Sequence, residues 1–100
     1  MMPVDEEFEL NGELFVWNSD KARINLRKHG VRFEEAASVF FDPFFVLADA
    51  SRNEEARDAV IGFDSSGRLL FVVHIEIEGA CIRIISARRA QPQEEAAYAQ

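Results

Sequence analysis

The chain has 100 residues, of which 48% are hydrophobic and 29% are charged. This size and balance indicate one globular domain with one core, and they exclude a disordered chain. The formal net charge of −7 argues against a nucleic-acid-binding protein, because phosphate contact normally requires a basic surface.

Cysteine usage and hydropathy indicate where the protein works. Cys81 is the single cysteine, so no disulfide forms within the chain, which fits a reducing compartment. No stretch approaches the roughly 20 apolar residues of a membrane span. The acidic start, with Asp5, Glu6 and Glu7, lacks the basic residues of a signal peptide. We therefore expect a cytoplasmic protein without a membrane partner.

Charge is unevenly distributed in the first third of the chain. Residues 1–13 carry five acidic side chains and no basic one, whereas residues 17–33 carry five basic side chains against Asp20 alone. An acidic protein can therefore still present a basic face, although runs of this size are as often simply solvated.

Hydrophobic periodicity predicts a hairpin and then a helix at the N-terminus. Residues 8–17 form two strands around Asn11-Gly12, because this pair suits the positive φ angles of a tight turn. Asn18 or Ser19 caps the helix that follows, and Gly30 ends it.

Further elements follow in the same way. A second helix spans residues 33–40 and ends at Asp42-Pro43, because the residue before proline avoids helical geometry. A last helix begins at Pro92. Strands are predicted over residues 44–47, 59–63, 69–77 and 82–86. The order predicts a single α+β domain over residues 1–100, in which a small antiparallel sheet carries helices on one face.

The strand over residues 69–77 has two different faces. Its odd positions are all apolar, whereas its even positions turn polar at His74 and Glu76. A two-residue loop at Glu78-Gly79 pairs His74 with Arg83. We prefer it because a loop one residue longer places Arg83 among the apolar odd positions, where an unpaired charge is costly.

A four-residue loop over residues 64–67 then places Arg57 level with His74. Arg57, His74, Glu76 and Arg83 form the predicted catalytic group on one sheet face. Arginine binds phosphate through a planar fork of donors, and an imidazole or a carboxylate moves protons. Such a group suits phosphodiester cleavage, for which RNA supplies its own 2′-OH. The alternative is that these charges merely pair across an exposed sheet face.

Other cations are candidates for RNA binding. Lys28 and His29 close the first helix, where they contact RNA or only complement the helix dipole. Arg88 follows the last strand and either contacts phosphate or is solvated. No cluster of His, Cys or acidic residues has ligand spacing, so we expect no metal and no other cofactor.

Several segments together resemble the BrnT family of ribonuclease toxins. The resemblance spans roughly residues 15–98, and its specificity comes from the order and spacing of the pieces. The pieces are Trp17-Asn18-Ser19-Asp20-Lys21-Ala22, residues 25–31, residues 33–37, Val39-Phe40, Asp42-Pro43, Glu55 with Arg57, Ile61-Gly62, residues 67–70, Val72-Val73, residues 82–88, and Glu94 or Glu95 with Tyr98.

The resemblance implies a RelE-like fold and a toxin of a type II toxin–antitoxin system. Such a toxin cuts cellular RNA without a metal and arrests growth. It implies a cognate BrnA-like antitoxin with a DNA-binding ribbon-helix-helix portion, in a heterotetramer of two toxins and two antitoxins that represses its own operon. Arg57, Arg83 and Arg88 fall on arginine positions of the family, and His29 falls on its lysine-histidine-glycine position.

One segment departs from the family pattern. Residues 1–14 form an acidic extension before the usual start, which either adds a hairpin strand or shields the site.

The alternative function is a non-catalytic module that binds the antitoxin and modulates operon repression, with the same arginines pairing antitoxin carboxylates. Direct DNA binding is a weaker third reading, because the chain is acidic and shows no clear recognition helix.

Overall fold

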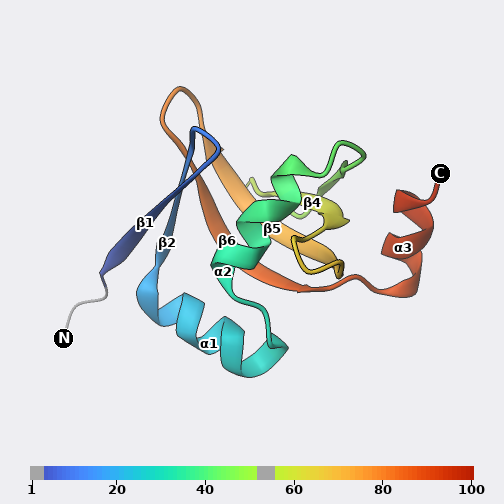
Figure 1. The fold of residues 1–100 in the computed structure, drawn as a ribbon, viewed down its shortest axis with the longest axis horizontal. Coiled ribbons are helices and arrows are strands. Elements are labelled where there is room, and N and C mark those ends of the chain that lie inside the picture. The colour runs from blue at the N-terminus through green and yellow to red at the C-terminus, as the bar shows by residue number, and fades with distance from the viewer. Residues whose placement is uncertain (1–3, 52–55) are drawn as a thin grey trace.

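The structure is a computed structural model, which describes residues 4–51 and 56–100. These residues form a compact α+β domain (Figure 1). In chain order, its described elements are β1 (Asp5–Leu10), β2 (Glu13–Asn18), α1 (Ser19–His29), α2 (Phe33–Ser38), the 3-10 helix η1 (Val39–Phe41), β3 (Val46–Asp49), β4 (Asp58–Phe63), β5 (Leu69–Ile77), β6 (Cys81–Arg89) and α3 (Pro92–Tyr98).

The described strands form one mixed sheet in the order β1-β2-β6-β5-β4-β3. Strands β2 and β6 run parallel, with Phe15 opposite Ile82 and Val16 opposite Arg83, and the other neighbours are antiparallel. The prediction of a purely antiparallel sheet is therefore wrong at this pair. A hairpin forces its strands to be antiparallel, but β2 and β6 are separated by most of the chain, so their direction is not fixed by a short turn.

Local signals placed the N-terminal turn and helix correctly, whereas β1 begins at Asp5, three residues before the predicted start. Asn11 and Gly12 have φ angles of 51° and 82°, as the hairpin turn requires. The Asn18 side chain accepts a hydrogen bond from the Lys21 backbone N–H at 3.0 Å and caps α1. Gly30 ends α1 in the left-handed conformation, with a φ of 71°.

The other predicted boundaries differ by small amounts. Strand β5 has the predicted bounds, whereas β6 extends past both ends of the predicted 82–86. Strand β3 starts two residues later than predicted. The helix predicted over residues 33–40 is α-helical to Ser38 and continues as the 3-10 helix η1.

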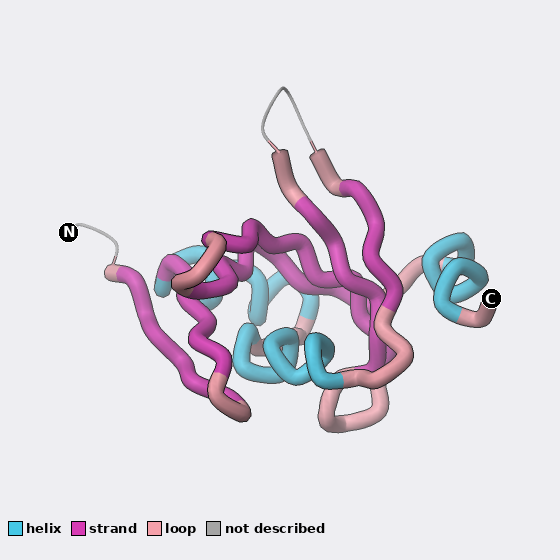
Figure 2. The backbone as a smooth tube through the Cα atoms, turned by 90° about the horizontal axis from the view of Figure 1, so that it is seen from above, coloured by secondary structure: helices cyan, strands magenta, loops and turns pink. Residues whose placement is uncertain are grey.

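The core lies between the sheet and the helices α1, α2 and η1. We call the side of the sheet that these helices cover the covered face. Figures 1 and 2 show α1 and α2 on the same side of the sheet. Phe33 of α2 is buried there and meets the Trp17 ring edge-on, with centroids 5.7 Å apart. The buried side chains from the sheet are Phe15, Trp17, Val60, Leu70, Val72, Ile82, Ile84 and Ala87.

The opposite side of the sheet, the open face, carries Phe71, Val73, Ile75, Arg83, Ser86 and Arg88. Helix α3 lies at its border rather than with α1 and α2. Its Tyr98 meets Phe63 edge-on at 5.3 Å and donates a hydrogen bond of 2.6 Å to Asp42 Oδ2. Phe63 points to the side opposite Gly62, and a Cβ added to Gly62 would lie 3.0 Å from Val39 Cγ1 on the covered face. The prediction that the helices share one face thus fails for α3.

The predicted registers across β4, β5 and β6 are wrong. His74 lies opposite Asp58 rather than Arg57, and Arg83 lies opposite Ile75 rather than His74. The β5–β6 loop has three residues, 78–80, because Ile77 pairs with Cys81. This longer loop is stable because the charge of Arg83 is paired: Asp5 of β1 lies 2.8 Å from it.

The β4–β5 loop is also longer than predicted and includes Arg68, because Phe63 pairs with Leu69. The Asp64 side chain organises this loop. Its Oδ1 accepts hydrogen bonds from the backbone N–H groups of Ser66 and Arg68, and its Oδ2 pairs with the Arg68 guanidinium at 2.9 Å. Loop length was thus set by a side-chain network rather than by the turn residues alone.

A β-bulge in β6 changes the direction of its later side chains. His74 lies opposite Ile84, whereas Val73 lies opposite Ser86, so Ile85 is the extra residue. A bulge shifts the alternation of the strand that contains it. Ser86 and Arg88 therefore point to the open face, and Ala87 is fully buried on the covered face.

Candidate functional site

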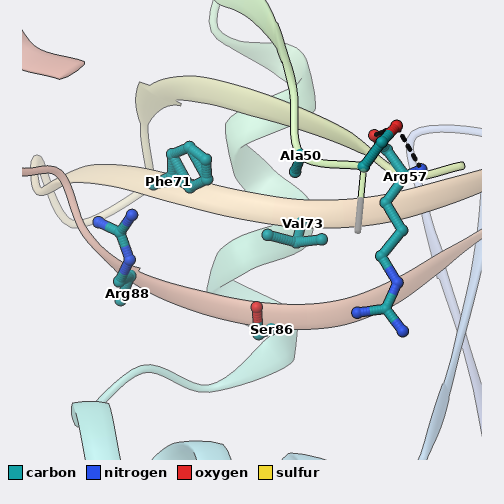
Figure 3. A pocket seen from close by; sticks show the side chains of 7 residues that line it. Ala50, Arg57, Phe71, Val73, Ser86 and Arg88 are labelled. Atoms are coloured by element: carbon teal, nitrogen blue, oxygen red, sulfur yellow. Dashed lines mark hydrogen bonds between the residues drawn. The ribbon is translucent and has the colours of Figure 1, made fainter. Parts of the chain in front are cut away.

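A hollow of about 360 Å³ lies on the open face. It is lined by Ala50, Ser51, Arg57, Phe71, Val73, Ser86 and Arg88. Figure 3 shows the Arg57 and Arg88 side chains on opposite sides of Val73 and Ser86. Two guanidiniums thus lie at opposite ends of one concave surface on the same face of the sheet. This arrangement suits an anionic group bound between them.

Backbone contacts hold Arg57 directly before β4. Its carbonyl oxygen accepts a hydrogen bond from the Ala50 N–H at 3.1 Å, and its own N–H donates to Ser51 Oγ at 3.4 Å (Figure 3). These contacts continue the β3–β4 pairing by one step. They fix the position from which the Arg57 side chain extends over the sheet.

Helix α3 fixes Arg88. Its two terminal nitrogens each donate to a different oxygen of Glu94, both at 2.8 Å, and its guanidinium lies 4.4 Å from the centre of the Phe71 ring. Hydrogen bonding to Glu94 raises the pKa of Arg88, and the same contact lowers the pKa of Glu94. Both groups are therefore ionised at neutral pH, and the guanidinium is held in one orientation.

Arg83 shares the open face but does not line this hollow. It lies on β6 opposite Ile75 and donates hydrogen bonds of 2.8 Å and 3.3 Å to the carboxylate of Asp5 on β1. The hydrogen bond to Asp5 raises the pKa of Arg83, and it lowers the pKa of Asp5. The acidic extension thus neutralises one of the predicted catalytic arginines.

His74 lies on the covered face, separated from the arginines by the sheet. It is 3% exposed, and its ring meets Phe40 edge-on at 4.8 Å. Burial lowers the pKa of His74, so the ring is neutral at neutral pH. The predicted grouping of His74 with Arg57 and Arg83 is wrong, because each register differs from the predicted one and alternate residues face opposite sides.

Glu76 lies near the tip of the β5–β6 hairpin. It is exposed and borders a different hollow, together with Gly12 of the β1–β2 turn and Glu13 at the start of β2. The structure thus brings together Arg57 and Arg88, and it does not bring Glu76 or His74 to them. The proton-transfer roles of His74 and Glu76 stay predictions.

Lys28 and His29 are exposed in the last turn of α1. They border a smaller hollow of about 190 Å³ between α1 and β6, which we call the α1 notch. Its lining is Lys21, Ile24, Asn25, Lys28, His29, Ile85 and Ser86.

Sequence reasoning missed Ser86 and Asn25. Ser86 lines both the open-face hollow and the α1 notch, but its direction depends on the bulge at Ile85. Asn25 is 5% exposed, and its amide both donates to the Ala87 carbonyl at 2.9 Å and accepts from the Ala87 N–H at 3.0 Å. The sequence did contain a signal for Asn25. It lies three residues after Ala22 and therefore on the same side of α1, so a polar side chain could be expected on the side of the helix that faces the core.

No group of three His, Cys, Asp or Glu side chains in residues 4–51 and 56–100 is arranged to hold a metal ion. No helix among the same residues has the length and apolar character needed to cross a membrane.

Comparison with known proteins identifies the family. No curated protein matches the chain. Residues 17–94, however, match the family model described as the ribonuclease toxin BrnT of type II toxin–antitoxin systems. The matched range includes Arg57, Arg83 and Arg88 and excludes β1. Because it covers more than half of the chain, this protein belongs to the BrnT family of ribonuclease toxins.

Proposed function

We propose that this chain is a metal-independent endoribonuclease that binds and cleaves RNA on its open face. The observation that carries the proposal is the placement of Arg57 and Arg88 around one hollow, on the side of the sheet that α1 and α2 leave uncovered. The family's description as ribonuclease toxins supports this use of the site.

In the proposed reaction, the RNA 2′-oxygen attacks the adjacent phosphorus. The new 2′-O–P bond forms as the P–O5′ bond breaks, which yields a 2′,3′-cyclic phosphate and a 5′-hydroxyl end. Arg57 and Arg88 stabilise the extra negative charge on the phosphoryl oxygens, and Ser86 offers a hydroxyl between them. Water takes the 2′-OH proton and supplies the proton that the 5′-oxygen gains. Electrostatic stabilisation of this kind is worth several kcal/mol.

The biological setting follows from the proposed activity. We propose that RNA cleavage in the cytoplasm arrests growth and that a BrnA-like antitoxin blocks it. The antitoxin would form a heterotetramer of two toxins and two antitoxins and would carry the complex to operator DNA. Arg88 and Arg83 each already donate hydrogen bonds to a carboxylate within this chain, so antitoxin carboxylates that reach the open face would find chemically suitable donors there.

The test compares two double variants that lose the same charge. Arg57→Ala/Arg88→Ala removes the guanidiniums of the hollow, whereas Arg23→Ala/Arg27→Ala removes two arginines of α1 that line neither hollow. With a chelator present, we expect the first variant to cleave single-stranded RNA about 10²- to 10³-fold more slowly than the wild type, and the second to cleave normally.

Controls separate the possible failures. Far-UV circular dichroism and urea unfolding confirm that each variant is folded. Wild-type cleavage by a folded Arg57→Ala/Arg88→Ala variant would show that the site is elsewhere. A folded wild-type chain that binds its antitoxin, but neither cleaves RNA nor arrests growth when expressed alone, would favour the non-catalytic module.

A further inference from the structure

The α1 notch combines positive charge with an apolar floor. Lys21 and Lys28 are two turns apart on one side of α1, with Ile24 between them and His29 beside them. Ile24 is 53% exposed, which is high for an isoleucine, and Ile85 forms the β6 side of the floor. Cations around an apolar surface match the two parts of a nucleotide, its phosphate and its base.

The notch is a built feature of the fold. Strand β2 pairs with β6 at Ile82 and Arg83 and then leads into α1, so the next part of the β6 edge faces the helix. Asn25 takes the place of a neighbouring strand there, because its buried amide pairs with both backbone groups of Ala87. The spacing between α1 and β6 is therefore fixed by hydrogen bonds in the core.

The notch adjoins the open-face hollow. Ser86 lines both, since its backbone lies on the β6 edge and its side chain points to the open face. A ligand bound between Arg57 and Arg88 that extends past Ser86 therefore reaches the notch. Adjacent phosphates of one extended strand are the kind of repeating anion that both places would accept.

The notch lysines are available for such contacts. In the part of the chain that the structure describes, no carboxylate pairs with Lys21 or Lys28, whereas Arg23 on another side of the same helix pairs with Asp20 at 3.0 Å. The helix thus carries a paired arginine away from the notch and lysines without carboxylate partners beside it.

We propose that the α1 notch is a second RNA subsite, which binds the nucleotide next to the phosphodiester held in the open-face hollow. This proposal rests on the proposed function. Lys21 and Lys28 bind the phosphate, and the base lies against Ile24 and Ile85. The RNA must be single-stranded, because a base reaches these side chains only when it is unpaired and unstacked.

The experiment compares Lys21→Ala/Lys28→Ala with Arg23→Ala/Arg27→Ala, which removes the same charge from the other side of α1. The binding probe is a short single-stranded RNA with 2′-O-methyl groups, which prevent cleavage, followed by fluorescence anisotropy at several salt concentrations. We expect the notch variant to bind roughly tenfold more weakly. Its slope of log affinity against log salt should fall by about 1.4, as expected for two lost phosphate contacts.

Cleavage kinetics sharpen the assignment. For a single-stranded oligonucleotide, the notch variant should show a higher KM and an unchanged kcat, because the lysines bind away from the reacting phosphorus. A dinucleotide has no second phosphate to reach the notch, so the two lysine substitutions should leave its cleavage unchanged. The Arg23→Ala/Arg27→Ala variant should resemble the wild type with both substrates.

The outcomes separate this proposal from the proposed function. Equal affinities and salt slopes for the two variants would overturn the subsite while leaving cleavage on the open face intact. A wild type that binds the probe without cleaving RNA would overturn the proposed function, and the anisotropy comparison would still measure the notch. A notch variant that loses antitoxin binding but keeps RNA affinity would assign the notch to a protein partner and overturn the subsite.

Discussion

The two faces of the sheet carry polar side chains with opposite uses. On the covered face, His74 is packed against Phe40 and is 3% exposed. On the open face, Arg57 and Arg88 border a hollow. His74 lies on β5, Arg88 lies on the neighbouring β6, and Arg57 directly precedes β4, the other neighbour of β5. The residue type alone does not tell whether such a group stabilises the fold or binds a ligand; the face on which it lies decides.

The open face also shows how a chain with a negative net charge can carry arginine side chains on one surface. Asp5 pairs with Arg83, and Glu94 pairs with Arg88, so some of the acidic side chains of the chain lie beside the arginines of the open face. These carboxylates orient the guanidiniums and also compete with any incoming phosphate. Net charge therefore gave little information about this face.

Substitution of His74 on the covered face is expected to have the largest effect, a loss of folding stability. His74→Ala leaves a cavity beside Phe40, and we expect it to lower the free energy of unfolding by about 2–4 kcal/mol, measured by urea unfolding. The open-face counterpart Ser86→Ala should change it by no more than about 0.5 kcal/mol but should slow RNA cleavage. Loss of cleavage by a folded His74→Leu variant would instead support the proton-transfer role predicted for this histidine.

Stability should depend on pH through the same residue. Burial, the largest influence, lowers the pKa of His74 below its usual 6.5, although Asp58 and Glu76 act in the opposite direction. The unfolded chain then binds a proton at a higher pH than the folded chain. The contribution of neutral His74 is complete above about pH 6.5 and is lost as the pH falls toward the folded pKa. Urea midpoints across this range should fall less steeply for His74→Leu than for the wild type.

A smaller effect is expected at the ion pair of the open face. Asp5→Ala removes the carboxylate that holds Arg83, so phosphate meets less competition and the KM for RNA should fall by about twofold to fivefold. Glu9→Ala removes the same charge from the same strand and has no such contact among the described residues. If both substitutions lower KM equally, the effect is one of net charge and the Asp5–Arg83 pair has no specific role.

The smallest effect tests how α3 is anchored beside the open face. The hydrogen bond to Asp42 raises the pKa of Tyr98, the single tyrosine, to about 12. Ultraviolet absorbance should therefore show a largely un-ionised tyrosine near pH 11, whereas Asp42→Asn should bring the midpoint back toward about 10. A wild-type midpoint near the ordinary value, in a folded chain, would contradict the contact that fixes α3.

Element positions were largely predictable because they depend on neighbouring residues. The bounds of β5 followed from its alternation and flanking turns, and α1 followed from Asn18 and Gly30. The two-layer α+β arrangement followed from the order of these elements. The change from α2 to the 3-10 helix η1, and the placement of α3, depended on packing that no local pattern records.

The site was only partly predictable. Arg57 and Arg88 were identified as candidates, but the sequence grouped Arg57 with His74 and Glu76. Loop lengths caused the error, because the Asp64–Arg68 contacts and the Asp5–Arg83 pair stabilise longer loops than turn residues alone predict. The bulge at Ile85 added a further shift, which brought Ser86 and Arg88 to the open face.

By itself, the sequence determined the kinds of element, most of their boundaries and the resemblance to BrnT toxins, because these depend on residues close together in the chain or on their order along it. The tertiary structure alone decided the parallel pairing of β2 with β6 and the face on which each polar residue lies. The physical reason is the two-residue period of a strand: a loop longer by one residue reverses every side chain beyond it. Contacts between distant residues, such as Asp5 with Arg83, determine which loop length is stable.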